Sequence, residues 1–170
     1  ASRAPADRAP MLWGNKPSDG GNLILSVSEA DKAIDRESFL SRFIFDFVGS
    51  QEFVKGIVRR CIWIDDADVE EAKKSTFIAG RLAAVSAMRM ASDAKSTQAF
   101  ADKSHRFRQI QGRGTDYSIV VPKVTSESRP YLPVGLLSLH TIVSDNAFAL
   151  YDAPIWNMAL IASRLHLVWI

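Results

Sequence analysis

Residues 117–150 read YSIVVPKVTSESRPYLPVGLLSLHTIVSDNAFAL and carry the clearest structural pattern in the chain. They contain four short apolar segments, YSIVVP, YLPVGLL, HTIV and AFAL, which proline, serine, aspartate and asparagine separate from one another. Short apolar runs bounded by turn residues are typical of strands that are joined by short connections. We therefore expect these four segments to form one largely antiparallel sheet.

Helices are predicted on the N-terminal side of these strands. Five apolar residues recur at helical spacing and predict a helix from Thr76 to about Met90: Phe77, Ile78, Leu82, Val85 and Met88. A second helical piece is expected at about residues 96–103, after a break near Ser92. Helices combined with a separate run of strands predict an α+β fold, a single mixed domain with several helices packed on its sheet.

The first third of the chain is predicted to mix both kinds of element. Short strands are expected at Leu23–Leu25 and within RRCIWID, residues 59–65. Ser28 and Asp31 are predicted to form the capping box of a helix, since they have the spacing that this motif requires. A further helix is predicted over residues 38–48, because phenylalanine recurs there every four residues, and Gly49 is expected to end it.

Composition limits the classes of protein to which the chain can belong. It has 170 residues, of which 47% are hydrophobic and 24% charged, which is ordinary for one globular domain. A formal net charge of only +2 excludes nucleic-acid binding through total charge alone. Cys61 is the one cysteine, so the chain has no internal disulfide, and its apolar neighbours predict a core position in a protein of a reducing compartment.

The two ends of the sequence differ from the middle. Residues 1–10, ASRAPADRAP, have the composition of a linker, so the folded domain is expected to span 11–170. Residues 153–170 are predicted to form one buried helix. Its polar residues Asn157, Arg164 and His166 argue against a membrane span. We expect a domain cut from a longer chain, with neighbouring parts on both sides.

Motifs for catalysis are absent from the sequence. It has no phosphate-binding loop of the G-x-x-x-x-G-K-[ST] type, no G-x-G-x-x-G and no G-x-S-x-G. The three histidines stand apart from one another and from Cys61, so no metal-ligand spacing is present. We expect this part of the protein to have no catalytic residue, no metal and no cofactor of its own.

Positive charge is concentrated in the middle of the chain. Residues 103–129 carry six basic side chains against only Asp116 and Glu127. A basic cluster suits the phosphate backbone of DNA, and four of its members are predicted phosphate contacts: Arg106, Arg108, Arg113 and Lys123. A solvated basic loop explains the charge equally well.

Hydrogen-bonding side chains lie just before the basic cluster. The segment DAKSTQAF, residues 93–100, places Lys95, Ser96 and Gln98 at the start of a predicted helix. Such side chains can approach a phosphate or the edge of a base, so all three are predicted base-reading residues. The same residue types also cap helices routinely.

Glu127 and Arg129 form the second group of predicted base-reading residues. Residues two apart in an extended segment point to the same face. A carboxylate accepts a hydrogen bond from cytosine, while a guanidinium donates two to guanine, so the two residues together can read one C·G pair. The alternative is an exposed ion pair worth ~0–1 kcal/mol, and spacing alone favours that alternative.

Several segments, taken in order, resemble the target recognition domain of MmeI-like (type IIL) restriction–modification enzymes. They are GNKPSDGGNLILS (14–26), VGSQEF (48–53), RRCIWI (59–64), VTSESRPYLPVGLL (124–137), SDNAFAL (144–150) and IASRLHLVWI (161–170). In that family one polypeptide combines a nuclease, an adenine-N6 DNA methyltransferase and a specificity domain. The resemblance implies that Glu127 and Arg129 select one base pair and that the region around Ser96 selects others.

The same resemblance implies partners and a location. Double-stranded DNA and the methyltransferase domain of the same polypeptide are the expected partners, and S-adenosylmethionine is the expected cofactor of that domain. The bacterial cytoplasm is the expected compartment. Pro130 stands where relatives often have a second basic residue, which leaves open the bases that are read.

Two other functions remain open from the sequence. The domain can serve as a protein-interaction module that docks on a methyltransferase through apolar ends. Alternatively, the acidic residues near Asp65 can hold a divalent ion in a small nuclease, with EAK at residues 71–73 as part of the site. A solvated helix face explains the acidic segment better.

Overall fold

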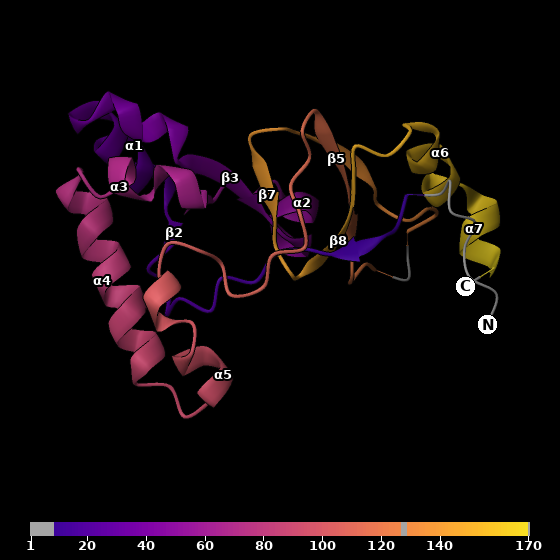
Figure 1. Ribbon diagram of the computed structural model, residues 1–170. Helices are drawn as coiled ribbons and strands as arrows, with labels where there is room; N and C mark the ends of the chain where they lie inside the picture. The colour runs from indigo at the N-terminus through magenta and orange to yellow at the C-terminus, as the bar shows by residue number, and fades with distance from the viewer. Residues whose placement is uncertain (1–8, 127–128, 170) are drawn as a thin grey trace. The chain divides into compact units, whose positions relative to one another are not determined.

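The computed structural model describes residues 9–126 and 129–169, which form an α+β fold with antiparallel strands (Figure 1). Contacts divide the chain into two compact units, each built from separate segments. The first unit contains residues 1–14, 48–57 and 111–170, and the second contains 15–47 and 58–110. The predicted α+β class is confirmed. The predicted linker, residues 1–10, falls mostly outside the described residues.

The first unit contains a four-stranded sheet in the order β1-β8-β5-β6. Its strands are β1 (Leu12–Trp13), β5 (Tyr117–Pro122), β6 (Gly135–Ser138) and β8 (Ala147–Tyr151), and each neighbouring pair is antiparallel. Val120 at the centre of β5 lies opposite Gly135 on one side and Ala149 on the other. A short buried strand, β7 (Thr141–Val143), lies between β6 and β8 in sequence. All four predicted strand segments therefore contain a strand, but β7 is not part of this sheet, so the prediction that the four segments form one sheet was wrong for HTIV.

Both faces of the central strand β5 are covered within the first unit. Ile119 and Val121 pack with Ile161 on one face, and Val120 packs with Phe53 on the other. The helices of this unit are α2 (Ser50–Lys55), α6 (Trp156–Ala162) and α7 (Arg164–Trp169). Burial on two faces explains why YSIVVP is a continuous apolar run and shows no alternation of polar and apolar residues.

The second unit contains the antiparallel strands β2 (Ile24–Leu25), β4 (Arg60–Ile62) and β3 (Ile44–Val48), paired in that order. The strands therefore lie in two sheets, whereas the sequence predicted one. The reason is that the N-terminal strands pair among themselves and bury Cys61, which confirms its predicted core position.

Helices make up most of the second unit. Its α-helices are α1 (Val27–Arg36), α3 (Val69–Ala72), α4 (Thr76–Met90) and α5 (Lys95–Gln98), and its 3-10 helices are Ser38–Arg42, Asp66–Asp68 and Ala101–Lys103. The long helix α4 confirms the prediction, with Ser75 accepting a hydrogen bond from the N–H of Ile78 at its start. Figure 1 shows α5 near the C-terminal end of α4.

Two predicted helices of the N-terminal half differ from the structure. The helix predicted over 38–48 was wrong beyond Arg42. Residues 38–42 form a 3-10 helix, whereas Phe45 and Phe47 alternate with less buried residues in β3, the pattern of a strand. The capping box of α1 uses Ser26 and Glu29, two residues before the predicted pair Ser28 and Asp31. Gly49 precedes α2 and ends no helix.

The C-terminal helix also differs from its prediction. Ser163 has extended backbone angles and separates α6 from α7. Leu165 and Val168 of α7 are 78% and 84% exposed, so the prediction that this segment is buried was wrong. Across the described residues, every helix is too short or too polar to span a lipid bilayer.

Candidate nucleic-acid interface

The three predicted base-reading residues of the second unit lie together on α5. Lys95, Ser96 and Gln98 are all exposed. Nη2 of Arg108 donates a hydrogen bond of 2.8 Å to Oγ of Ser96, which joins a predicted phosphate contact to a predicted base reader. Nε2 of Gln98 donates to the carbonyl of Ser92 at 2.7 Å, and this bond holds the amide in one orientation.

Arg106 is paired with an acidic residue. Its Nη1 lies 3.3 Å from Oδ2 of Asp66, and Nε2 of His105 lies 2.8 Å from Oδ1 of the same carboxylate. The hydrogen bond from His105 and the positive charge of Arg106 lower the pKa of Asp66. The three side chains line a hollow of about 240 Å³ together with Trp63, Ile64, Asp65, Phe107 and Ile110. A phosphate at Arg106 would therefore compete with Asp66 for the guanidinium.

Arg89 of α4 binds the backbone of the segment that follows α5. Its side chain is fully buried, and its five N–H donors are all used on backbone carbonyls. The acceptors lie 2.8–3.1 Å away and belong to Pro17, Ser18, Phe100, Lys103 and Arg106. Arg89 thus fixes the segment between α5 and Arg108 to the long helix.

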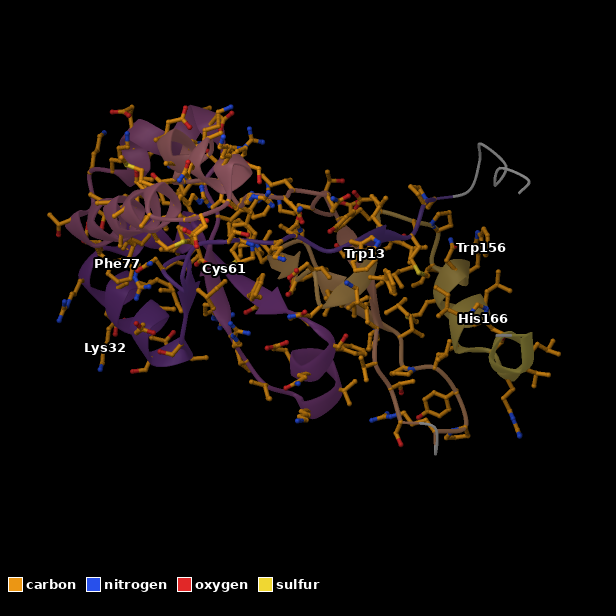
Figure 2. The ribbon with its side chains drawn as sticks, turned by 90° about the horizontal axis from the view of Figure 1, so that it is seen from below. Trp13, Lys32, Cys61, Phe77, Trp156 and His166 are labelled. Atoms are coloured by element: carbon orange, nitrogen blue, oxygen red, sulfur yellow. The ribbon has the colours of Figure 1, made fainter. Side chains whose placement is uncertain are left out.

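The predicted phosphate contacts of the first unit lie in different settings. Arg113 is exposed in the loop between Gly112 and Gly114. Lys123 is half-buried, with Nζ 3.4 Å from the centre of the Trp13 ring and 5.3 Å from that of Phe148. Figure 2 shows Trp13 beside the strands of this unit. The ammonium of Lys123 also donates to the carbonyl of Asp145, so it already has partners within the unit.

Glu127 lies outside the described residues, so its orientation relative to Arg129 stays a prediction. Arg129 is half-buried and lies between the end of β5 at Pro122 and the start of β6 at Gly135. Its backbone N–H donates to the carbonyl of Ser126 at 3.1 Å. Arg129 therefore lies outside the strands that the structure describes.

The acidic residues near Asp65 are engaged in contacts with basic and aromatic side chains. Arg42 pairs with Asp68 and Glu71, and Lys73 pairs with Glu70. Asp65 accepts a hydrogen bond from Nε1 of Trp63 at 3.2 Å. Among the described residues, no group of three or more histidine, cysteine, aspartate or glutamate side chains is arranged to hold a metal ion.

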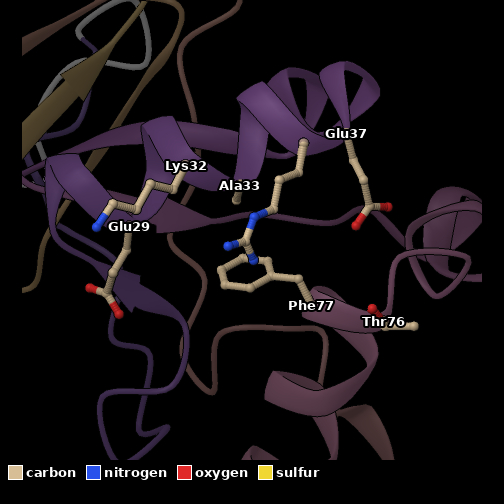
Figure 3. A pocket seen from close by; sticks show the side chains of 7 residues that line it. Glu29, Lys32, Ala33, Glu37, Thr76 and Phe77 are labelled. Atoms are coloured by element: carbon tan, nitrogen blue, oxygen red, sulfur yellow. The ribbon is translucent and has the colours of Figure 1, made fainter.

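A second hollow, of about 420 Å³, lies between α1 and the start of α4 (Figure 3). Glu29 and Lys32 of α1, Glu37 after it, and Thr76 and Phe77 of α4 line it. The carboxylate of Glu29 binds Nη2 of Arg81 at 2.7 Å, and that of Glu37 accepts from Oγ of Ser75 at 3.0 Å. Both carboxylates therefore serve to connect the two helices.

A family model described as the MmeI target recognition domain matches residues 1–170. The chain belongs to this family. DNA methyltransferase A of Bacillus subtilis (strain 168) is 36% identical over 165 residues, which are 97% of this chain and 19% of that protein. A solved structure of the type IIL restriction–modification enzyme MmeI in complex with DNA matches with a TM-score of 0.87 and 28% identity. It covers 99% of this chain and 22% of that one. The chain thus spans about a fifth of the length of both proteins.

The MmeI-type domain also contains important residues that sequence reasoning missed. Arg89 occupies a buried position of α4 in line with Ile78, Leu82 and Val85. A charged residue at an apolar position of the helical pattern is the one sequence feature that could have indicated a structural role. Asp66 and His105 are 39 residues apart, and no local pattern connects them. Asp152 binds the loop at Thr115, which is 37 residues away along the chain.

Proposed function

We propose that this domain reads base edges of double-stranded DNA in the major groove. In doing so it positions the methyltransferase domain of the same polypeptide, an adenine-specific enzyme with S-adenosylmethionine as its cofactor. The single observation that carries the proposal is the match along 99% of the chain to a solved relative whose structure contains DNA.

The described side chains support contacts of two chemical kinds. Ser96 and Gln98 offer a hydroxyl and an amide, groups that can bond to base edges. Arg106, Arg108, Arg113 and Lys123 are the proposed phosphate contacts, with Lys95 beside Ser96 as a further base reader. Arg108 reaches Ser96 directly, so one hydrogen bond connects the positioning and reading groups in this unit.

Glu127 and Arg129 are the proposed readers of one C·G pair. The carboxylate would accept from the amino group of cytosine, and the guanidinium would donate to O6 and N7 of guanine. The half-buried position of Arg129 in the β5–β6 connection limits its freedom, which favours a defined contact.

The proposal is tested by exchanging this charge pattern in the full-length protein. The double variant Glu127→Lys with Arg129→Asp should methylate sites that carry G·C in place of C·G at one position. Sequencing of methylated DNA reads the site directly. Reversing the exposed pair Glu70 and Lys73 is the matched control and should leave the site unchanged. An unchanged site in the first variant as well would contradict the assignment of the two residues.

A second candidate function, docking on the methyltransferase domain, is favoured by the C-terminal helices. Five large apolar side chains on or beside α6 and α7 are at least half exposed: Ile155, Trp156, Leu160, Leu165 and Val168. Figure 2 shows Trp156 and His166 on these helices. Apolar groups gathered in this way mark interaction surfaces. Substituting Leu165 and Val168 with serine should weaken methylation at every site and leave the recognised sequence unchanged.

A further inference from the structure

Asp152 binds the loop that carries Arg113. Its Oδ1 accepts hydrogen bonds from the backbone N–H groups of Thr115, Asp116 and Tyr117 at 3.0, 2.9 and 3.2 Å. Its Oδ2 accepts from the N–H and Oγ1 of Thr115 at 2.8 and 3.0 Å. One carboxylate therefore fixes three consecutive backbone groups of a loop.

The backbone of Asp152 has an uncommon conformation. Its φ of 48° lies in the left-handed region, which few residues other than glycine, asparagine and aspartate adopt. The N–H of Asp152 donates to the carbonyl of Tyr117 at 3.1 Å, so the loop is bound through main chain and side chain together. An uncommon conformation of this kind persists only where surrounding contacts hold it.

Two glycines shape the loop on either side of Arg113. Gly112 has a φ of 155°, and a Cβ there would lie 2.9 Å from the ring of Tyr151. A Cβ on Gly114 would lie 2.2 Å from the carbonyl oxygen of Tyr117. The backbone thus lies against β5 and β8 at positions that exclude side chains, while Arg113 itself is exposed.

We propose that Asp152 is a positioning residue for DNA binding. It orders residues 112–117 so that the side chain of Arg113 contacts a phosphate of the DNA. The inference rests on the proposed function. An ordered loop loses less conformational freedom on binding than a free one, so preorganisation increases affinity without adding a contact to the DNA.

The sign of the effect separates positioning from simple electrostatics. A carboxylate near DNA repels the phosphates, so its removal alone would strengthen binding. Positioning predicts the opposite result. Asparagine tolerates the same backbone conformation, but its amide nitrogen cannot accept hydrogen bonds from Thr115. Asp152→Asn therefore removes the two hydrogen bonds from Thr115 to Oδ2 and places an N–H donor there, while keeping the size and backbone of the side chain.

The experiment compares four variants of the full-length protein: Asp152→Asn, Arg113→Ala, both together, and Asp116→Asn. The last removes a carboxylate from the same loop and is the matched control, because Asp116 binds Asp152 through its backbone. Affinity is measured over a range of salt concentrations for two labelled duplexes. One carries the motif that the wild-type protein methylates, and the other lacks it.

The expected result is a loss of roughly three- to tenfold in affinity on both duplexes for each of Asp152→Asn and Arg113→Ala. The double variant should bind no more weakly than the worse single variant, because the two residues act through one contact. Asp116→Asn should bind as tightly as wild type or more tightly.

Other outcomes overturn the inference. Unchanged or tighter binding by Asp152→Asn, losses that multiply in the double variant, or no loss in Arg113→Ala would each do so. A wild-type protein that binds neither duplex would instead overturn the proposed function. If Asp152→Asn unfolds at the assay temperature, Thr115→Ala replaces it. That variant removes only the Oγ1 donor and should give a smaller loss, again absent when Arg113 is alanine.

Discussion

Arg89 and Arg106 are joined by a hydrogen bond of 2.8 Å, from Nη2 of the buried guanidinium to the backbone carbonyl of the second arginine. Burial lowers the pKa of Arg89, and the nearby Asp19 opposes that shift. The buried charge is matched by five carbonyl dipoles, and a buried charge needs such hydrogen-bonded partners. The buried Arg89 therefore fixes the backbone position of Arg106, which we propose as a phosphate contact.

Replacing Arg89 with methionine should lower the free energy of unfolding by more than about 3 kcal/mol. The change keeps an apolar stem but removes five hydrogen bonds from a charged donor to backbone carbonyls, and one such bond contributes roughly 1.5–3 kcal/mol. Chemical denaturation measures the effect. Met90→Ala is the control, because Met90 is 67% exposed on the same helix and should change stability by less than about 0.5 kcal/mol. Equal losses in both variants would contradict the role of Arg89.

Arg108→Gln should weaken DNA binding by the full-length protein on all sequences. Loss of a phosphate contact reduces the slope of affinity against salt concentration by about 1. Ser96→Ala, on the partner of Arg108, should instead reduce discrimination at one position of the recognised site. Arg36→Gln, an exposed arginine of α1, serves as the control. A salt slope unchanged in Arg108→Gln would rule out its phosphate contact.

Glu29→Ala should destabilise the second unit in a pH-dependent way. The N–H and hydroxyl of Ser26 bind its carboxylate at 2.9 and 2.8 Å and, with Arg81, hold the pKa of Glu29 below its usual range. The folded protein thus favours the ionised form. Its contribution, about 0.5–1 kcal/mol, is present above the ordinary glutamate pKa of about 4.3 and is lost as pH falls through the folded value.

The thermal midpoints of wild type and Glu29→Ala should therefore differ at neutral pH and converge as the pH falls through the pKa of Glu29 in the folded protein. Asp31→Asn tests the alternative cap, since Asp31 was predicted from sequence to close the box. It should change the midpoint little at either pH. A larger effect at Asp31 than at Glu29 would contradict the observed cap.

Cys61 should be inert in the folded protein. Its side chain is fully buried, and burial raises the pKa of its thiol. Because the thiolate is the reactive form, a disulfide reagent such as Ellman's reagent should label it only after denaturation. The chain has no other cysteine, so the absorbance reports this residue alone. Rapid labelling under native conditions would show that the strand around Cys61 opens readily.

Local patterns predicted the elements whose burial follows a single regular period. Helix α4 and strand β5 were predicted with their observed bounds, because one has a 3.6-residue apolar stripe and the other is a continuous apolar run. Phenylalanines in residues 38–48 recur both every four residues, as in a helix, and every two residues, as in a strand. Pairing of β3 with β4 fixed the strand, since backbone partners override a weak local preference.

The sequence by itself determined the α+β class, the two kinds of DNA-contacting side chain that we propose, and the family to which the chain belongs. These properties reside in residue types and in their order along the chain. Only the tertiary structure decided that Arg89 binds five carbonyls and that Asp152 binds the loop of Arg113. Both arrangements join backbone groups to side chains far away in sequence, and no local pattern encodes where such groups meet.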